Sequence, residues 1–153
     1  MIRIPHGVYA DMAAHAAHEY PDECCGYITG TDNPVNWTVH RCRNIQNELH
    51  ARDPEQYPRD ARTAYVFSQE DMAALFYGEY ESPDARVIGF FHSHPDHPAY
   101  FSEKDRLDAL TDWLDPEPGY LVLSVIKGFV EDLKWFQWRA DGEIFEELAL
   151  EMI

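Results

Sequence analysis

The residues best suited to chemistry lie between His92 and Asp105. His92 and His94 are two positions apart, so on an extended chain their imidazoles point to the same face and can reach one ion. Two histidines and one carboxylate, with a fourth position left for water, form the open arrangement expected of a catalytic zinc. Iron or manganese would accept the same ligands, but this set of histidine and carboxylate favours zinc.

Two predicted elements must position these ligands. Residues 86–91 form a continuous apolar run of strand length, which predicts a buried strand with the histidines at its end. A helix is predicted to begin at Ser102, with Asp105 in its first turn. Its apolar residues recur at helical spacing, at Leu107, Leu110 and Leu114.

Each part of this pattern also has a plain structural explanation. Ser102 followed by Asp105 is a helix N-cap with an acidic residue at the third helical position. The pair His92 and His94 on an apolar strand can also be structural. The joint pattern H-x-H-P-x6-S-x-x-D is rarer, because its five fixed positions coincide by chance only about once in several million windows. We therefore predict a metal site, with which a capping serine is compatible.

This joint pattern resembles the signature of the JAMM or MPN-plus zinc metallopeptidases. The resemblance implies that His92, His94 and Asp105 bind one catalytic Zn²⁺, and that Ser102 stabilises an oxyanion. It also implies a single domain over residues 1–153 with the MPN fold, which is similar to that of cytidine deaminases.

The same family requires a catalytic glutamate upstream, and the resemblance implies Glu23. This residue lies in residues 21–30, which are similar to the segment before the first core strand in small bacterial members. The residues by themselves also leave Asp22 and Glu19 as candidates. A glutamate after a helix and a proline is otherwise a common solvated turn residue.

The resemblance further implies a substrate. Small bacterial members are similar to enzymes that trim an adduct or extension from the C-terminal glycines of a ubiquitin-like sulfur-carrier protein. We therefore expect a peptidase or isopeptidase that acts on such a Gly-Gly tail and needs no cofactor beyond zinc.

Two other functions remain open. An MPN scaffold would bind partners without turnover, although such scaffolds usually lack one or more of the ligands present here. The stretch from His92 to His97 also matches the H-x-H-x-D-H motif of metallo-β-lactamases, but no histidine follows His97 to complete that site. The zinc deaminase pattern H-x-E with P-C-x-x-C is absent.

Composition and charge indicate which classes of partner and which cellular compartment to expect. A formal net charge of −16 in 153 residues argues against nucleic acid and anionic membranes as partners. No apolar run is long enough to span a membrane and the start of the chain lacks a signal peptide, so we expect a cytoplasmic protein. The three cysteines, Cys24, Cys25 and Cys42, have no zinc-finger spacing and are expected to be reduced thiols, with a nucleophilic role for Cys24 or Cys25 a lesser alternative.

The acid excess also suggests a hypothesis about habitat. The chain has 28 acidic residues against 12 basic ones. Such a surface suits concentrated salt, where ions screen the repulsion between like charges. A merely acidic protein of ordinary surroundings is the alternative.

Apolar periodicity predicts the remaining elements of an α/β (α+β) fold. We expect helices over residues 7–19 and 68–80, and strands over residues 26–30, 35–42, 65–67, 120–126, 130–138 and from 143. The second helix should bury Met72, Leu75, Phe76 and Tyr80. Together these elements predict a mixed sheet of about six strands flanked by about three helices.

Residues 44–64 are polar, contain two prolines and show no sustained period, which predicts a long loop. The resemblance implies that this segment lies near the cleft as a substrate-binding flap. Five of the nine arginines lie in or beside it, at positions 41, 43, 52, 59 and 62. They could receive an acidic partner or a C-terminal carboxylate, or they could simply be solvated.

Overall fold

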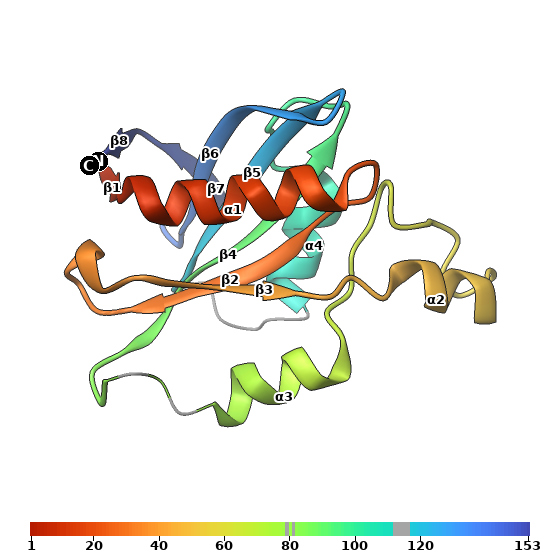
Figure 1. Ribbon diagram of the computed structural model, residues 1–153, viewed down its shortest axis with the longest axis horizontal. Helices are drawn as coiled ribbons and strands as arrows, with labels where there is room; N and C mark the ends of the chain where they lie inside the picture. Colours follow the sequence, from red (N-terminus) through yellow and green to blue (C-terminus); the bar gives the residue numbers. More distant parts are fainter. Residues whose placement is uncertain (79, 81, 112–116) are drawn as a thin grey trace.

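A six-stranded mixed sheet forms the centre of the protein (Figure 1). The computed structural model describes residues 1–78, 80, 82–111 and 117–153. In sheet order the strands are β3 (Thr38–Cys42), β2 (Cys25–Gly30), β4 (Arg86–Pro95), β5 (Gly119–Ile126), β6 (Phe129–Arg139) and β7 (Ile144–Leu148). The described helices are α1 (His6–Glu19), α2 (Gln46–Arg52), α3 (Gln69–Tyr77) and α4 (Glu103–Thr111), with a 3-10 turn η1 (Pro34–Asn36). The predicted α+β class and six-stranded sheet are confirmed.

The strand predicted over residues 86–91 continues through both histidines to Pro95. It continues because β5 pairs with it in parallel along its whole second half, as far as Pro95 opposite Val125. A parallel pair requires a crossover connection, and α4 lies in the one between β4 and β5. The first turn of α4 therefore follows closely after the carboxyl end of β4, where the two histidines lie.

The two faces of the sheet carry separate cores because side chains alternate along each strand. Leu121, Leu123 and Val125 of β5 pack toward α1, together with Val8, Met12 and Ala16 of that helix. Tyr120 and Val122 pack on the opposite face, which α3 and α4 cover with Leu75 and Ala109. Phe90 of β4 belongs to this second core, so His92 and His94, two and four residues further on, face α4.

The two chain ends meet in a small parallel sheet that was not predicted. β1 (Ile2–Ile4) pairs with β8 (Leu150–Met152), beside the amino end of α1 (Figure 1). Three-residue strands are too short to show an alternating pattern, so the sequence carries little signal for them. No helix in the described part of the chain is both long and apolar enough to cross a bilayer.

The predicted loop over residues 44–64 is partly wrong, because it contains α2. This helix is only seven residues long and buries just Gln46 and Leu49, which is too short a stripe to register as a period. It raises the number of described helices to four, one more than predicted. The strand predicted over residues 65–67 is also wrong, since only Phe67 pairs, in an isolated bridge to Asn44.

Three predicted helix and strand features need correction. Phe76 is 65% exposed and Tyr80 lies beyond the end of α3, so Leu75 is the helix's one buried residue. Leu107 of α4 is 49% exposed, because that helix turns Asp105 and Ala109 inward instead. Leu114 lies outside the described residues. The strand predicted over residues 35–42 begins only at Thr38, after η1.

Candidate metal centre

The three predicted ligands come together on the buried face of β4 under α4. His92 Nε2 lies 3.1 Å from Asp105 Oδ1, and His94 Nε2 lies 3.2 Å from Asp105 Oδ2. The two Nε2 atoms are 3.2 Å apart. All three side chains are buried, with 2% to 7% of each residue exposed.

These separations fit a tetrahedral zinc ion. Zinc bonds to nitrogen and oxygen of about 2.0–2.1 Å place neighbouring ligand atoms about 3.3 Å apart. His94 Nδ1 donates to Pro98 O at 2.9 Å, which leaves the Nε2 lone pair directed at the other two ligands. Tyr65 stacks on His92, with ring centroids 4.8 Å apart, and holds that imidazole in its plane. The donor set therefore fits the metal that the sequence predicts.

Ser102 and Asp105 form a capping box at the start of α4. Ser102 Oγ accepts from Asp105 N at 3.0 Å, and Asp105 Oδ2 accepts from Ser102 N at 3.0 Å. The plain explanation of this pair is therefore confirmed. The same bonds aim the carboxylate at the histidines and leave the Ser102 hydroxyl hydrogen free of any described acceptor.

The pKa of Asp105 is lowered by this arrangement. Burial alone would raise it, but the neighbouring His92 and His94 imidazoles and the hydrogen bond from the Ser102 amide outweigh burial. The carboxylate is thus kept in the ionised form that a metal ligand requires.

Glu23 lies at the same site, although it comes from a turn far away in the sequence. Its backbone N donates to Ala61 O at 2.7 Å, and its carbonyl accepts from Asn44 Nδ2 at 2.9 Å. The next residue, Cys24, is hydrogen-bonded through both N and O to Ser93, between the two histidines. These four bonds fix Glu23 beside the ligand strand.

Glu23 is 5% exposed and borders the same cleft as His94 and Asp105. Burial raises the pKa of Glu23 well above its usual range, and the Asp105 carboxylate adds to this effect. Lys104 and Arg59 act in the opposite direction. A carboxylate whose pKa is raised in this way accepts a proton more readily than an ordinary glutamate, as a general base requires.

A small cleft of about 120 Å³ opens above the site. Glu23, His94, Ser102 and Asp105 line it. The segment after α2 forms one wall, and the loop that joins β4 to α4 forms the other. Of the predicted segment 44–64, the last part lines the cleft, through Arg59, Arg62, Thr63 and Ala64.

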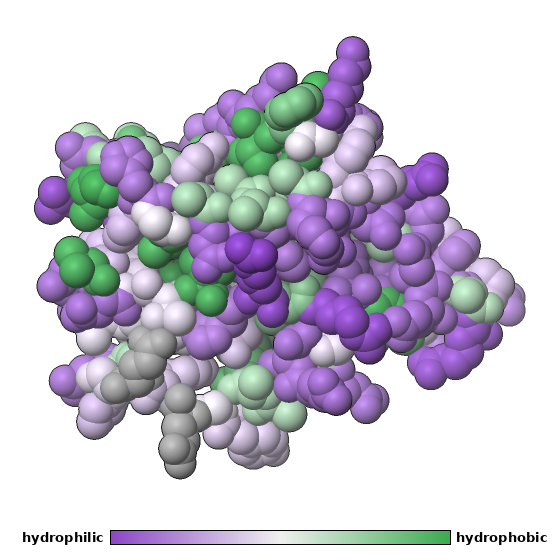
Figure 2. Space-filling view, in the orientation of Figure 1, coloured by the Kyte–Doolittle hydropathy of each residue, from purple (hydrophilic) through white to green (hydrophobic). Residues whose placement is uncertain are grey.

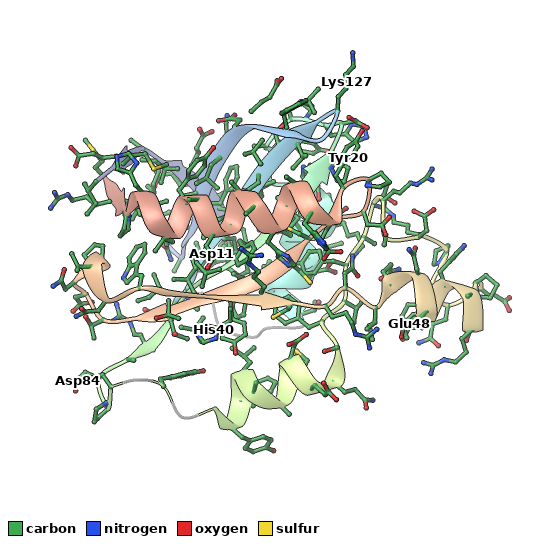
Figure 3. The ribbon with its side chains drawn as sticks, viewed as in Figure 1. Asp11, Tyr20, His40, Glu48, Asp84 and Lys127 are labelled. Carbon is green, nitrogen blue, oxygen red and sulfur yellow. The ribbon has the colours of Figure 1, made fainter. Side chains whose placement is uncertain are left out.

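Asp96 holds the loop after β4 in place. It has a left-handed backbone, with φ of 58°, and its carboxylate accepts from Tyr20 Oη at 2.7 Å and from Lys127 N at 2.8 Å. Figure 3 shows Tyr20 at the end of α1 below the turn that carries Lys127. Asp96 therefore joins three elements and is not placed as a metal ligand.

The rival candidates lie elsewhere. His97 borders the cleft but is outside the group of metal-ligating atoms found among the described residues, which comprises His92, His94 and Asp105. Asp22 accepts from Asn47 Nδ2, and Glu19 lies near His15 and His18, so neither belongs to the cleft wall.

The cysteines are free and buried. Burial raises the pKa of Cys24 to about 12, so its sulfur is a thiol at neutral pH and unsuited to nucleophilic attack. The interpretation of these residues as small buried side chains agrees with the structure.

Sequence reasoning missed Tyr65, Ser93 and Asn44 as parts of the site. Ser93 could have been found from its place between two ligands, where its own side chain must face the opposite side of the strand. Tyr65 and Asn44 carry no local signal, because only the tertiary fold brings them to His92 and Glu23.

A family described as prokaryotic homologs of the JAB domain matches residues 5–141. No curated protein matches the chain significantly.

Several solved structures share the fold. The solution structure of a protein from Desulfitobacterium hafniense is 24% identical, with a TM-score of 0.66, over 100% of this chain and 93% of that one. The crystal structure of a JAB1/MPN domain protein from Archaeoglobus fulgidus is 16% identical, with a TM-score of 0.52, over 99% and 97%. A structure titled "JAMM: A Metalloprotease-like Zinc Site in the Proteasome and Signalosome" is 16% identical, with a TM-score of 0.51, over 100% and 98%. These likenesses confirm the expected fold.

Proposed function

Because this chain belongs to the family of prokaryotic homologs of the JAB domain, we propose that it is a zinc-dependent peptidase or isopeptidase. The observation that carries the proposal is the convergence of His92, His94 and Asp105 within 4.8 Å of one another, with Glu23 bordering the same cleft. A scaffold has no need to bury an ionised carboxylate against two imidazoles, because an uncompensated charge of this kind is costly.

His92, His94 and Asp105 would hold the ion, and the other residues would handle protons and charge. Bound zinc supplies a Lewis acid that acidifies water and polarises the scissile carbonyl. Glu23 would accept the proton of the attacking water and return it to the departing amine, as its raised pKa allows. Ser102 would donate its free hydroxyl hydrogen to the oxygen that gains negative charge.

We propose that the substrate is the C-terminal Gly-Gly tail of a ubiquitin-like sulfur-carrier protein. The small cleft supports a thin, extended substrate, since about 120 Å³ accommodates roughly one residue beside the site. Glycines have no side chain to exclude from so narrow a space. The folded part of such a carrier would remain outside the cleft.

The test is to offer the zinc-loaded protein a sulfur carrier that bears a C-terminal extension. Wild-type protein should release the extension, and Glu23→Gln should bind zinc normally but lose at least 100-fold in rate, because general acid–base catalysis contributes about 10²–10⁴-fold. Absence of cleavage by wild type, or equal cleavage by Glu23→Gln, would reject the proposal. Purified protein that binds no zinc at equimolar supply would favour a scaffold.

A further inference from the structure

Two thirds of the arginines in this protein form ion pairs with neighbouring acids in the described part of the chain. Of the nine arginines, six form ion pairs with described carboxylates: Arg3, Arg41, Arg43, Arg86, Arg106 and Arg139. Arg52, Arg59 and Arg62 have no carboxylate partner among the described residues. In a chain of net charge −16, an arginine left without an acid is unusual.

Two of these three exceptions share one location. Arg59 and Arg62 line the cleft that contains Glu23, whereas Arg52 lines a separate hollow beside Glu48 and Glu70. Lys104 also lines the cleft, but its Nζ lies 2.6 Å from Asp108 Oδ2 and is neutralised there. Arg59 and Arg62 are therefore the cleft cations without an acidic partner in the described part of the chain.

The backbone that carries these two arginines is held rigidly by side chains. Gln46 Nε2 donates to Arg59 O at 2.8 Å, and Asp60 Oδ1 accepts from Arg62 N at 2.9 Å. Asn47 Oδ1 accepts from Ala61 N at 2.8 Å. Ala61, which lies between the arginines, thus donates its N–H to a side chain of α2, and its O accepts from Glu23 N. These hydrogen bonds fix the backbone of both arginines relative to Glu23.

Most of the hydrogen-bonding capacity of these guanidinium groups is free. Arg59 Nη1 donates once, to Thr63 O at 3.3 Å, and no bond from the Arg62 guanidinium to a described residue is present. A guanidinium has five N–H donors in a planar fork that matches a carboxylate in two parallel bonds. Figure 2 shows mainly hydrophilic residues over α2 and the segment that follows it, and the part of this segment that lines the cleft includes Arg59, Arg62 and Thr63.

We propose that Arg59 and Arg62 form a subsite that binds a carboxylate of the substrate next to the scissile amide. The inference rests on the proposed peptidase function and adds to it a requirement for negative charge. The carboxylate could belong to a free C-terminus or to an acidic side chain. Because the cavity holds roughly one residue, the charged group must lie within about one residue of the bond that is cut.

The location of the arginines agrees with this role. Arg59 is near enough to Glu23 to lower the pKa of that carboxyl, although it makes no ion pair with it. Arg59 and Arg62 also lie on either side of Ala61, whose O accepts from Glu23 N, so the subsite lies beside the residue that would deliver a proton to the departing amine. A negative group on the departing part of the substrate would meet the two guanidinium groups there.

The test measures binding and cleavage separately. Binding is measured by calorimetry with zinc-loaded Glu23→Gln protein and four short peptides: Gly-Gly-Ala with a free carboxylate, the same peptide as an amide, and the amides of Gly-Gly-Asp and Gly-Gly-Asn. At least one carboxylate peptide should bind about tenfold or more tightly than its neutral counterpart, since hydrogen bonds to charged groups contribute about 1.5–3 kcal/mol and 1.4 kcal/mol is tenfold. Which pair shows the preference identifies a terminal or a side-chain carboxylate.

Variants then assign that preference to residues. Adding Arg59→Gln and Arg62→Gln together should abolish the preference and leave the affinity for neutral peptides unchanged. Arg52→Gln is the matched control, because it also removes an arginine without an acidic partner but lies outside the cleft, and it should keep the preference. Equal binding of charged and neutral peptides, or an unchanged preference in the double variant, would overturn the subsite.

Cleavage by the wild-type protein separates this inference from the proposed function. Cleavage of charged and neutral peptides at equal rates would sustain the peptidase and eliminate the subsite. A binding preference without cleavage of either the peptides or the carrier with a C-terminal extension would sustain the anion site and eliminate the peptidase.

Discussion

Cys24 and Ser93 bind each other through two hydrogen bonds that run in opposite directions. Cys24 N donates to Ser93 Oγ at 2.8 Å, and Ser93 N donates to Cys24 O at 3.2 Å. Ser93 lies between the two proposed metal ligands, His92 and His94, and Cys24 follows Glu23. The two bonds thus tie the proposed acid–base residue directly to the strand that carries the proposed ligands.

Ser93→Ala should destabilise the protein and impair the site together. It leaves the buried Cys24 amide without an acceptor, which costs about 1–3 kcal/mol in the free energy of unfolding. Urea unfolding measures this loss. Glu23→Gln is the comparison, since it keeps both backbone bonds and should lose activity without a similar loss of stability. Unchanged stability in Ser93→Ala would show that the Cys24–Ser93 bond has no such role.

Ser102→Ala should lose more in activity than its role as a cap explains. Loss of the cap costs about 0.5–2 kcal/mol in stability, and loss of an oxyanion donor costs about 10²–10³ in kcat. Ser68 caps α3 in the same way, accepting from Asp71 N at 3.2 Å, so Ser68→Ala is the matched control. Equal activity of the two variants, with similar losses of stability, would reduce Ser102 to a cap.

Metal removal should destabilise the protein only when Asp105 is intact. Zinc that binds the folded state alone stabilises it by about 2.7 kcal/mol at one hundred times its Kd. A chelator should therefore lower the Tm of the wild-type protein and leave that of Asp105→Asn unchanged. Asp108→Asn on the same helix should respond to the chelator as wild type does. If the chelator leaves the Tm of the wild-type protein unchanged, the metal site is contradicted.

His15 should make stability depend on pH. Burial lowers the pKa of His15 below its usual value of 6.5, and its Nε2 donates to Cys25 O and Cys42 O. Because the folded-state pKa is depressed, this contribution is present above pH 6.5 and is lost as pH falls through the folded-state pKa. The Tm should thus fall more steeply from pH 7 to pH 5 for the wild-type protein than for His15→Gln. Parallel profiles would exclude His15 as the cause.

Potassium chloride should stabilise the protein if its acid excess suits concentrated salt. The Debye length falls from about 10 Å at 0.1 M to about 3 Å at 1 M, which suppresses repulsion among the 28 acidic side chains. Unfolding in urea should therefore show a free energy that rises toward molar salt. A free energy that falls over this range would indicate an ordinary acidic protein instead.

The sequence by itself determined the parts of the site that are close in the chain. His92 and His94 share a face because side chains alternate along any strand, and Asp105 follows a capping serine by the three residues that a first helical turn requires. These relations depend on local geometry, so the residue types and their spacing were enough to predict a metal site. The six strands of the main sheet followed in the same way from apolar runs.

The tertiary structure decided how distant residues meet at that site. Glu23 reaches the ligands only because β2 pairs with β4, placing Cys25 opposite His92. Arg59 and Arg62 reach the cleft only because side-chain amide groups of α2 hold the following segment against Glu23. Such contacts depend on strand pairing and hydrogen bonds between segments many residues apart, and the identity of one residue does not specify its distant partner.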